Sequence, residues 1–546
     1  MKRKPHFIAT FLFFTILLSG CSSAAPPADG PAPSYTTLTM FSNVTFWDLP
    51  DWTLAEGTVT AEASERTGVV LDITIPPQAA DRKLSLLLLK DDLPDLLALS
   101  ESNVIRQLID ADAVWKLDEL LETYCPDSHL LTKFPEDMKA EQIRQYGGWY
   151  AYPSNINSDD ARELWPERTD YYGNLVHYRQ NNGILWNRAL LKQAGLTDDD
   201  LKTQAQVLAA LEKIKAIHTT ADGEEIIPLL FEGNSYQDSS LIYLNNSFGV
   251  EAVDENGNYK SCWLQPEYKD TLKFVNTAVR SQYLSPEHLS FDNLQIRSLM
   301  KSGRVFCFIG NVSNTGVTAE NWLTTGPVLS ESGRRPVLGM ELTTPTGWLR
   351  TFVSKSCKHP EAAARFIDYM TSDEGLTAIY FGKEGNDFYY DSDGLIRRTE
   401  TGQQKAEDPA SHLAKFWNFY NSAWEHSRIP VPEEESPERQ WADIQCAFAK
   451  DPDTVIYNSS LLRLPDHYFP PESELRKALD AIEEFRRQQL PKVISASSDA
   501  EFEAEYQIFL DGQRALGIDK IDRKINEQMH RNFAEYDEVI TRVNGL

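Results

Sequence analysis

The chain has 546 residues, of which 41% are hydrophobic, and it carries 81 acidic against 53 basic residues, a formal net charge of −28 at pH 7. This acidity argues against nucleic acid as a partner, because binding a polyanion requires a basic surface. The apolar content is ample for a core, and the length exceeds what a single core usually supports, so we expect two lobes or more.

The N-terminus has the pattern of a secretory signal. Lys2, Arg3 and Lys4 precede a largely apolar run over residues 7–18, which is shorter than the roughly 20 residues that a membrane-spanning helix needs. The residues that follow, Ser19-Gly20-Cys21, complete a sequence LSGC that resembles a bacterial lipobox. We therefore predict a signal peptide over residues 1–20 and a diacylglycerol on Cys21. An ordinary secretory signal with a cysteine at its cleavage site is the alternative.

The segment after the predicted cleavage site has the composition of a tether. Residues 21–34 are rich in Ala, Pro and Ser, which favours an extended and flexible chain rather than a core. We expect the folded body to begin near Tyr35. Cleavage would leave 50 basic against 81 acidic residues, a net charge of about −31.

Five further cysteines are spread singly along the chain: Cys125, Cys262, Cys307, Cys357 and Cys446. Their number is odd and none form a close pair, so the spacing favours small buried side chains. A disulfide between two of them stays open as an alternative. The spacing also lacks the clustered ligands of a zinc site.

In chain order, apolar runs of strand length alternate with helical patterns, which predicts α/β layers. Residues 36–43, 69–77 and 83–99 are β-like segments with helical or loop spacers between them. Residues 184–186 predict a strand that leads into a helix capped by Asn187 and ended by Gly195. Apolar spacing predicts further helices over 207–214, 272–283 and 363–370, and from residue 410 onward the chain is strongly helical and charged, with an aromatic-rich segment at 412–426.

Several segments, taken together and in order, resemble the family 1 extracellular solute-binding proteins, specifically the long lipoprotein branch that serves oligosaccharide importers of Gram-positive bacteria. They are LPD at 93–95, YGGWYAYPSN at 146–155, ILWNRALLKQAGL at 184–196, LKFVNTAVRSQYLSPE at 272–287, MKSGRVFCFIGN at 300–311, CKHPEAAARFIDYMTSDEG at 357–375, GKEGNDFYY at 382–390 and IFLDGQRALGIDKIDRKINEQ at 508–528. Each motif alone is loose, and their shared order carries the resemblance.

The resemblance implies an α/β, two-lobe periplasmic-binding-protein-like (type II) fold with a hinge and a long helical C-terminal part. It implies a ligand held in the cleft between the lobes, with closure around it. We expect the first lobe over residues 35–155 plus about 326–400, and the second over residues 156–325 plus about 401–546.

One departure from the branch concerns metal. Its members often carry a calcium loop rich in Asp and Asn, whereas residues 218–228 here are HTTADGEEIIP, with only Asp222, Glu224 and Glu225 as candidate ligands. A second calcium-like start at residue 254 lacks the required glycine and the closing glutamate, which are Tyr259 and Gln265 here. We therefore assign no metal and no cofactor.

The resemblance and the composition together indicate a carbohydrate ligand. Sugars present apolar C–H faces ringed by hydroxyls, so a sugar site needs aromatic platforms and polar partners, and the chain has 12 tryptophans. The predicted platforms are Trp47, Trp149, Tyr150, Tyr236 and Trp348. The predicted polar partners are Asn43, Asp48, Glu232, Asn234 and Asp387. For each of these residues alone, packing inside a lobe is the competing interpretation.

The resulting hypothesis is a monomeric lipoprotein on the outer face of the cell membrane that captures an oligosaccharide for the permease subunits of an ABC importer. It predicts no catalytic residues. A secreted glycoside hydrolase is the main alternative, because acidic residues are plentiful and the same aromatics would suit its cleft. A receptor for a non-carbohydrate solute on the same fold is the other, since fold does not determine the ligand.

Overall fold

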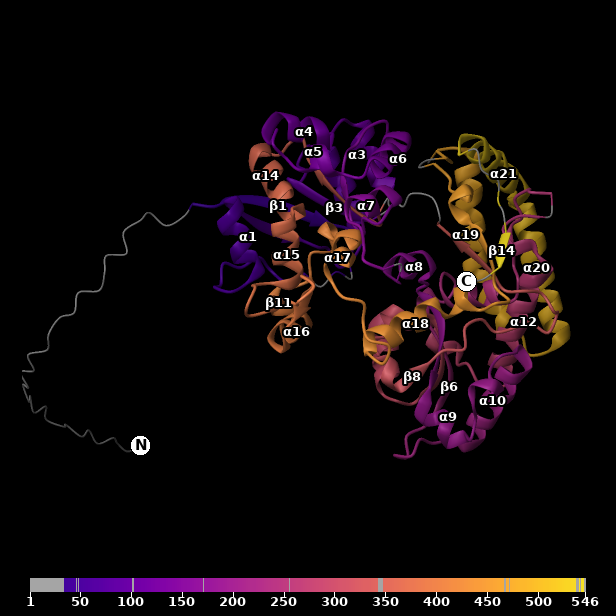
Figure 1. Ribbon diagram of the computed structural model, residues 1–546. Coiled ribbons are helices and arrows are strands. Elements are labelled where there is room, and N and C mark those ends of the chain that lie inside the picture. Colours follow the sequence, from indigo (N-terminus) through magenta and orange to yellow (C-terminus); the bar gives the residue numbers. More distant parts are fainter. Residues whose placement is uncertain are drawn as a thin grey trace, which may run out of the picture.

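The computed structural model describes residues 34–45, 47, 49–100, 103–169, 171–254, 256–341, 347–465, 468–470, 472–536, 540 and 542–544. Cys21, the signal peptide and Asp48 lie outside these residues. The described chain forms two α/β lobes, with long helices from the C-terminal part stacked on the second (Figure 1). The predicted fold class is confirmed.

The first lobe is built on a five-stranded sheet of order β2-β1-β3-β10-β4. β1, β2 and β3 are parallel, and β10 runs antiparallel to β3 and β4. The strands are β1 (Thr36–Ser42), β2 (Val69–Thr74), β3 (Leu96–Ser100), β4 (Tyr152–Pro153) and β10 (Leu349–Val353). The predicted segment 83–99 splits into a helix and the strand β3, because Asp91 adopts a positive φ of 56° and Pro94 cannot continue a helix.

Helices cover both faces of this sheet, as the unbroken apolar run of β3 requires. Leu96 and Ala98 face one layer, which includes α1, α4 and α14, while Leu97 and Leu99 face another with α2 and α3. The helices of this lobe are α1 (Val59–Thr67), α2 (Ala80–Leu89), α3 (Asn103–Asp110), α4 (Leu117–Tyr124), α5 (Leu130–Lys133), α6 (Glu136–Tyr146), α7 (Asp159–Leu164), α14 (Pro360–Thr371), α15 (Asp373–Phe381), α16 (Glu400–Glu407) and α17 (Ser422–Arg428). A small hairpin, β11 (Phe388–Tyr390) and β12 (Ile396–Arg398), lies beside α16.

The core of the first lobe also includes residues from the segment that follows α16. Leu413, Phe416, Phe419 and Trp424 are buried together with the α1 and α14 side chains. Residues 400–428 therefore pack with the first lobe, beyond the boundary near residue 400 that the sequence indicated.

The second lobe has a four-stranded sheet of order β6-β7-β5-β8. Its strands are β5 (Asn182–Asn187), β6 (Ile227–Phe231), β7 (Val305–Asn311) and β8 (Trp322–Leu323). β6 and β7 are parallel, whereas β5 is antiparallel to both β7 and β8. The predicted passage from strand to helix at Asn187 is present: its side chain accepts hydrogen bonds from Ala189 N and Leu190 N, and Gly195 ends the helix with φ 59°.

The helices of the second lobe surround this sheet and a separate three-stranded sheet of order β14-β13-β9. They are α8 (Tyr171–Tyr178), α9 (Arg188–Ala194), α10 (Gln204–Ile217), α11 (Ser240–Ser247), α12 (Pro266–Arg280), α13 (Asn293–Lys301), α18 (Pro437–Lys450), α19 (Glu474–Ile494), α20 (Asp499–Ala515) and α21 (Ile518–Glu535). The strands of the small sheet are β9 (Val337–Met340), β13 (Val455–Asn458) and β14 (Arg542–Asn544).

The C-terminal helices share the core of the second lobe. Leu490 of α19 and Phe502 and Phe509 of α20 are buried with Leu272 and Val275 of α12. Asn276 of α12, which is fully buried, donates to the carbonyls of Ile494 and Ala496 at 3.1 and 2.8 Å. A buried amide with two satisfied donors fixes the end of α19 against the lobe.

Two further features of the described chain bear on the sequence interpretation. Each of the five cysteines from Cys125 to Cys446 is a free thiol, and Cys307, Cys357 and Cys446 are buried. None of the described helices combines the length and the apolar character needed to cross a membrane.

Candidate functional site

In the first lobe, one edge of the sheet gathers polar residues from four strands. β1 and β3 run parallel and end near this edge, while β10 begins there, with Leu349 opposite Ser100. Asn43, which follows β1, accepts a hydrogen bond from Ser100 N at 2.8 Å and donates to Asp81 at 2.9 Å. At the end of β4, Ser154 N donates to the Leu349 carbonyl. This edge is therefore a carboxyl edge, the usual ligand-binding side of an α/β sheet.

The second lobe has an equivalent edge. β6 and β7 end there, and β5 begins there, with Asn182 opposite Asn311. Glu232 follows β6 and is buried; its carboxylate accepts from Asn311 N at 2.7 Å and from Asn314 Nδ2 at 2.8 Å. Asn234 lies two residues further on, in a 3-10 turn, and its side chain is exposed.

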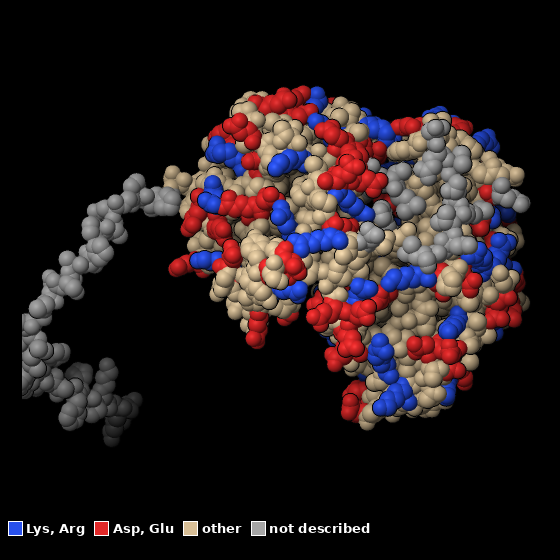
Figure 2. Space-filling model, in the orientation of Figure 1, with Lys and Arg blue, Asp and Glu red and all other residues tan. Residues whose placement is uncertain are grey.

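The covalent path of the chain brings both edges to the junction of the lobes. β4 ends at the carboxyl edge of the first lobe, the chain crosses between α7 and α8, and β5 begins at the carboxyl edge of the second lobe. β9 lies in the second lobe, and the next strand, β10, begins at the carboxyl edge of the first lobe; the chain crosses a last time between α17 and α18. The outline of the molecule is notched between the two lobes (Figure 2). Interfaces between domains are favoured positions for ligand sites.

Three tryptophans meet at the first-lobe side of this junction, and we call Trp47, Trp348 and Trp417 the tryptophan shelf. The rings of Trp47 and Trp417 are stacked, with centroids 5.9 Å apart and planes 13° apart, and Trp348 lies 6.4 Å from Trp417. Trp47 is buried and donates its indole N–H to the Lys415 carbonyl at 2.9 Å. Trp348 is 37% exposed, so the shelf presents an indole to solvent directly before β10.

A polar pair follows the shelf along the chain. Tyr420, whose N–H donates to the Trp417 carbonyl, donates its hydroxyl to Glu425 Oε2 at 2.5 Å. Burial raises the pKa of the Glu425 carboxyl above its ordinary value, although the Tyr420 hydrogen bond and the Arg398 charge oppose this. The pair can both donate and accept hydrogen bonds, as recognition of a hydroxyl requires.

The predicted site residues divide into two groups. Asn43, Trp47, Trp348, Glu232 and Asn234 lie at the carboxyl edges described above. The others are engaged inside the lobes, and as ligand contacts they stay predictions. Trp149 is buried against Phe134 and donates to Ala151 O, Tyr236 is buried in the second-lobe core, and Tyr150 is half-buried. Asp387 is 3% exposed and pairs with Lys405 Nζ at 2.8 Å.

Trp417, Tyr420 and Glu425 did not emerge from the sequence as site residues. They belong to the aromatic-rich segment 412–426, for which the sequence predicted only a helix. The structure makes most of this segment turns, with a 3-10 turn at Trp417–Phe419, and α17 begins at Ser422. The high density of aromatic residues in this segment is the feature of the sequence that could have indicated a ligand site.

Two pockets of the second lobe lie away from the junction. One of 840 Å³ is lined by Asn187, Gly303 and Trp322, and one of 850 Å³ by Ile227, Tyr283 and Arg304. β6 and β7 begin near these residues, so both pockets are at the edge of the sheet opposite the junction. The geometry therefore favours the junction as the candidate site.

The loop that departs from the calcium pattern forms a tight turn between α10 and β6. Thr219 and Glu225 form an isolated bridge, Thr220 N donates to Glu224 O, and Gly223 has φ 86°. The side chains of Asp222, Glu224 and Glu225 are exposed. Within the described part of the chain, no three or more His, Cys, Asp or Glu side chains form a group that could hold a metal ion.

Comparison with known proteins places the chain in a family. Residues 58–377 match the family model of the bacterial extracellular solute-binding proteins. The chain belongs to this family. Its members are binding proteins of the extracytoplasmic space, and the expected resemblance is confirmed at this level. No protein in a search of curated sequences matches.

Solved structures show the same fold at low sequence identity. FusA of S. pneumoniae, an ABC-transporter substrate-binding protein in complex with kestose, has a TM-score of 0.64 at 16% identity over 92% of this chain and all of its own. An HMO-binding solute-binding protein of Bifidobacterium longum infantis has 0.59 at 13% identity, with 91% and 98% covered. The N-glycan transport protein NgtS of Streptococcus pneumoniae has 0.57 at 13% identity, with 92% and 99% covered.

Removal of calcium is expected to leave this solute-binding protein unchanged. The loop at residues 218–228 lacks the alternating oxygen ligands that calcium requires, and its turn is held by hydrogen bonds within the chain, such as that from Glu224 N to Thr220 Oγ1 at 3.2 Å. Melting temperatures measured with EDTA and with added calcium should agree within error. A fall of many degrees in EDTA, reversed by calcium but not by magnesium, would reveal a calcium site in this protein.

Proposed function

We propose that this protein captures an oligosaccharide between its lobes and delivers it to the permease subunits of an ABC importer. The observation that carries the proposal is the tryptophan shelf, which offers stacked indoles beside a segment that crosses between the lobes. Three proteins of the same fold are described as binding kestose, HMO and N-glycan ligands. The family and the site chemistry thus favour the same ligand class.

The chemistry of the junction suits a sugar. The apolar C–H face of a pyranose or furanose ring can stack on the exposed indole of Trp348, which buries apolar surface from both partners. Hydroxyls at the rim of the ring need donors and acceptors, and the side-chain amides of Asn43 and Asn234 carry both kinds. A ligand that contacts both carboxyl edges gains most of its contacts when the lobes close, so binding favours a closed form.

The direct test of the proposal is a thermal-shift screen against a panel of neutral and acidic oligosaccharides. A ligand that binds only the folded state raises the melting temperature, by an amount that follows its concentration relative to Kd. We expect at least one oligosaccharide to stabilise the protein and to be recovered intact after prolonged incubation. Catalytic accumulation of shorter products would instead favour a glycoside hydrolase, and stabilisation by peptides alone would favour a non-carbohydrate receptor.

Trp348→Ala is expected to weaken binding of that oligosaccharide. Removal of an aromatic anchor costs about 1 kcal/mol or more, which is about a fivefold or larger increase in Kd. Titration calorimetry measures the change. The control is Trp115→Ala, because Trp115 lies at the opposite edge of the same sheet, where its backbone N–H donates to Val353 O. We expect the control to keep its affinity even if it loses stability; equal Kd values for the two variants would remove Trp348 from the site.

We further propose that Cys21 carries a diacylglycerol and that residues 21–34 tether the lobes to the outer face of the cell membrane. The LSGC sequence supports this proposal, and two acyl chains provide the stable anchoring that a single chain does not. The tether would enter the fold at β1, whose first residue is Thr36.

Cys21→Ser should therefore release the protein from the membrane fraction into the medium. The folded lobes are untouched by the change, so the melting temperature of the released protein should equal that of the soluble domain. Immunoblots of membrane and medium fractions measure the distribution. Retention of the variant in the membrane fraction would show that another feature holds it there.

A further inference from the structure

Glu141 of α6 is a buried carboxylate held mainly by its own lobe. Its side chain is 6% exposed. Arg144 binds both oxygens of the Glu141 carboxylate, with Nε 2.7 Å from Oε2 and Nη2 2.6 Å from Oε1. Gln145 also donates to Oε1, at 2.7 Å. Burial alone would raise the pKa of Glu141, but these partners and Arg463 bring that pKa below its ordinary value. The first lobe thus presents a fixed negative charge at its surface.

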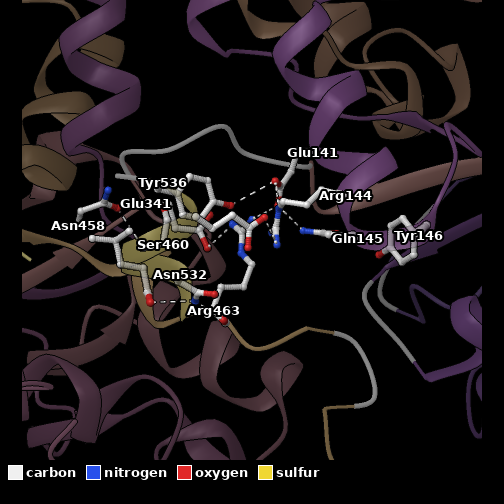
Figure 3. A network of polar contacts seen from close by, with 12 residues as sticks. Glu141, Arg144, Gln145, Tyr146, Glu341, Asn458, Ser460, Arg463, Asn532 and Tyr536 are labelled. Atoms are coloured by element: carbon white, nitrogen blue, oxygen red, sulfur yellow. Dashed lines mark hydrogen bonds and ion pairs between the residues drawn. The ribbon is translucent and has the colours of Figure 1, made fainter. Parts of the chain in front are cut away.

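The second lobe supplies two groups to this charge (Figure 3). Arg463 Nη1 lies 3.3 Å from Glu141 Oε1, and the Tyr536 hydroxyl donates to Oε2 at 3.3 Å. Arg144 in turn lies 3.5 Å from Glu535 and over the Tyr536 ring, 5.5 Å from its centroid. The contacts between lobes are longer than the 2.6–2.7 Å contacts within the first lobe, so they are the part of the network that can separate without dismantling α6.

The network also includes the residue that follows β9. Arg463 Nη2 lies 3.2 Å from Oε1 of Glu341. Glu341 is the residue that directly follows β9. On the other side, Arg350 of β10, the strand that the crossing segment enters, donates to the hydroxyl of Tyr146 at 2.7 Å. Tyr146 is the last residue of α6, the helix that carries Glu141. Glu341 is therefore tied to the network by Arg463, and β10 is tied to the helix that carries Glu141.

Arg463 is well placed to act from the second lobe because its backbone is fixed. Its carbonyl accepts a hydrogen bond from Asn532 Nδ2 at 2.8 Å, and its N–H donates to Ser460 O at 3.1 Å. Asn458, which ends β13, lies opposite Met340 at the end of β9, so the turn that carries Arg463 follows the same sheet edge as Glu341. From this fixed backbone the Arg463 side chain, 23% exposed, reaches Glu141 of the first lobe.

We infer that Arg463 acts as an ionic brace that couples Glu141 of the first lobe to Glu341 at the start of the crossing segment, and so restricts the angle between the lobes. The Arg463–Glu141 and Arg144–Glu535 ion pairs and the Tyr536 hydrogen bond oppose any rotation that moves α6 away from α21 and the turn at residues 459–463. Because Glu141 keeps Arg144 and Gln145 when Arg463 is removed, the brace can be released without leaving a buried carboxylate unpaired. The inference concerns the lobes themselves and does not depend on what the junction binds.

The test measures the distance distribution between the lobes in the ligand-free protein. Spin labels at Glu122 of α4 and Glu483 of α19, two exposed positions, report on the two lobes. They are attached through a ketone-bearing amino acid, since the chain has native thiols. We expect Arg463→Gln to broaden the distribution or shift its mean. Salt at 1 M, where the screening length is about 3 Å, should move the wild-type distribution towards that of the variant and change the variant less, since the variant keeps only the Arg144–Glu535 ion pair of this network between the lobes.

Two further variants make the outcome decisive. Lys269→Gln removes an ion pair within the second lobe, with Glu503 at 2.7 Å, and should retain the wild-type distribution. Tyr536→Phe removes only the weakest of the links and should give an intermediate distribution. If Arg463→Gln and Lys269→Gln both keep the wild-type distribution at low salt, Arg463 does not restrict the lobes and the inference is overturned.

Discussion

The burial of each sheet beneath helices on both faces determines where this protein can bind a ligand. Leu96, Leu97, Ala98 and Leu99 of β3 are completely buried, alternately in two helical layers, so neither face of the first-lobe sheet is open to a solute. The edges remain, and the carboxyl edge is the one from which the chain departs to the second lobe. Polar residues at strand ends can thus face another lobe without disturbing a core, which is why the junction collects Asn43, Ser154, Asn234 and the tryptophan shelf.

The same constraint separates residues that serve the fold from those that can serve a ligand. Glu232 and Asp387 are carboxylates at or near the ends of elements, but each is buried and already bound by internal donors. A buried carboxylate needs such donors to offset its lost hydration, and a ligand hydroxyl would have to compete with them. Trp348 is 37% exposed, so a sugar can bury further apolar surface on its indole, and this favours Trp348 over the buried candidates.

Local patterns in the sequence predicted the parts of the fold that depend on neighbouring residues. The strand and helix around Asn187, the helix that Pro360 begins and the helical C-terminal part all follow from apolar spacing and capping, and the ordered motifs indicated the family. The tryptophan shelf could not be found in this way, because the partner of Trp47 lies 368 residues away, in the turn at Lys415–Trp417. The position of residues 400–428 in the first lobe has the same cause: their apolar side chains would suit either core, and only the tertiary arrangement selects one.

The ionic brace and the tryptophan shelf both act on the equilibrium between different angles of the two lobes. A ligand that bridges the two carboxyl edges stabilises whichever lobe angle gives it the most contacts, and its observed affinity is its intrinsic affinity multiplied by the fraction of molecules at that angle. Contacts such as those of Arg463 set that fraction before any ligand arrives, although they lie on α6 and the turn at residues 459–463 rather than on the shelf. Affinity in this protein is therefore a property of the lobe angle as well as of the site, and substitutions that never touch a ligand can change it. Salt weakens partly exposed ion pairs. The lobe angle is therefore also sensitive to ionic strength, which varies outside the cell.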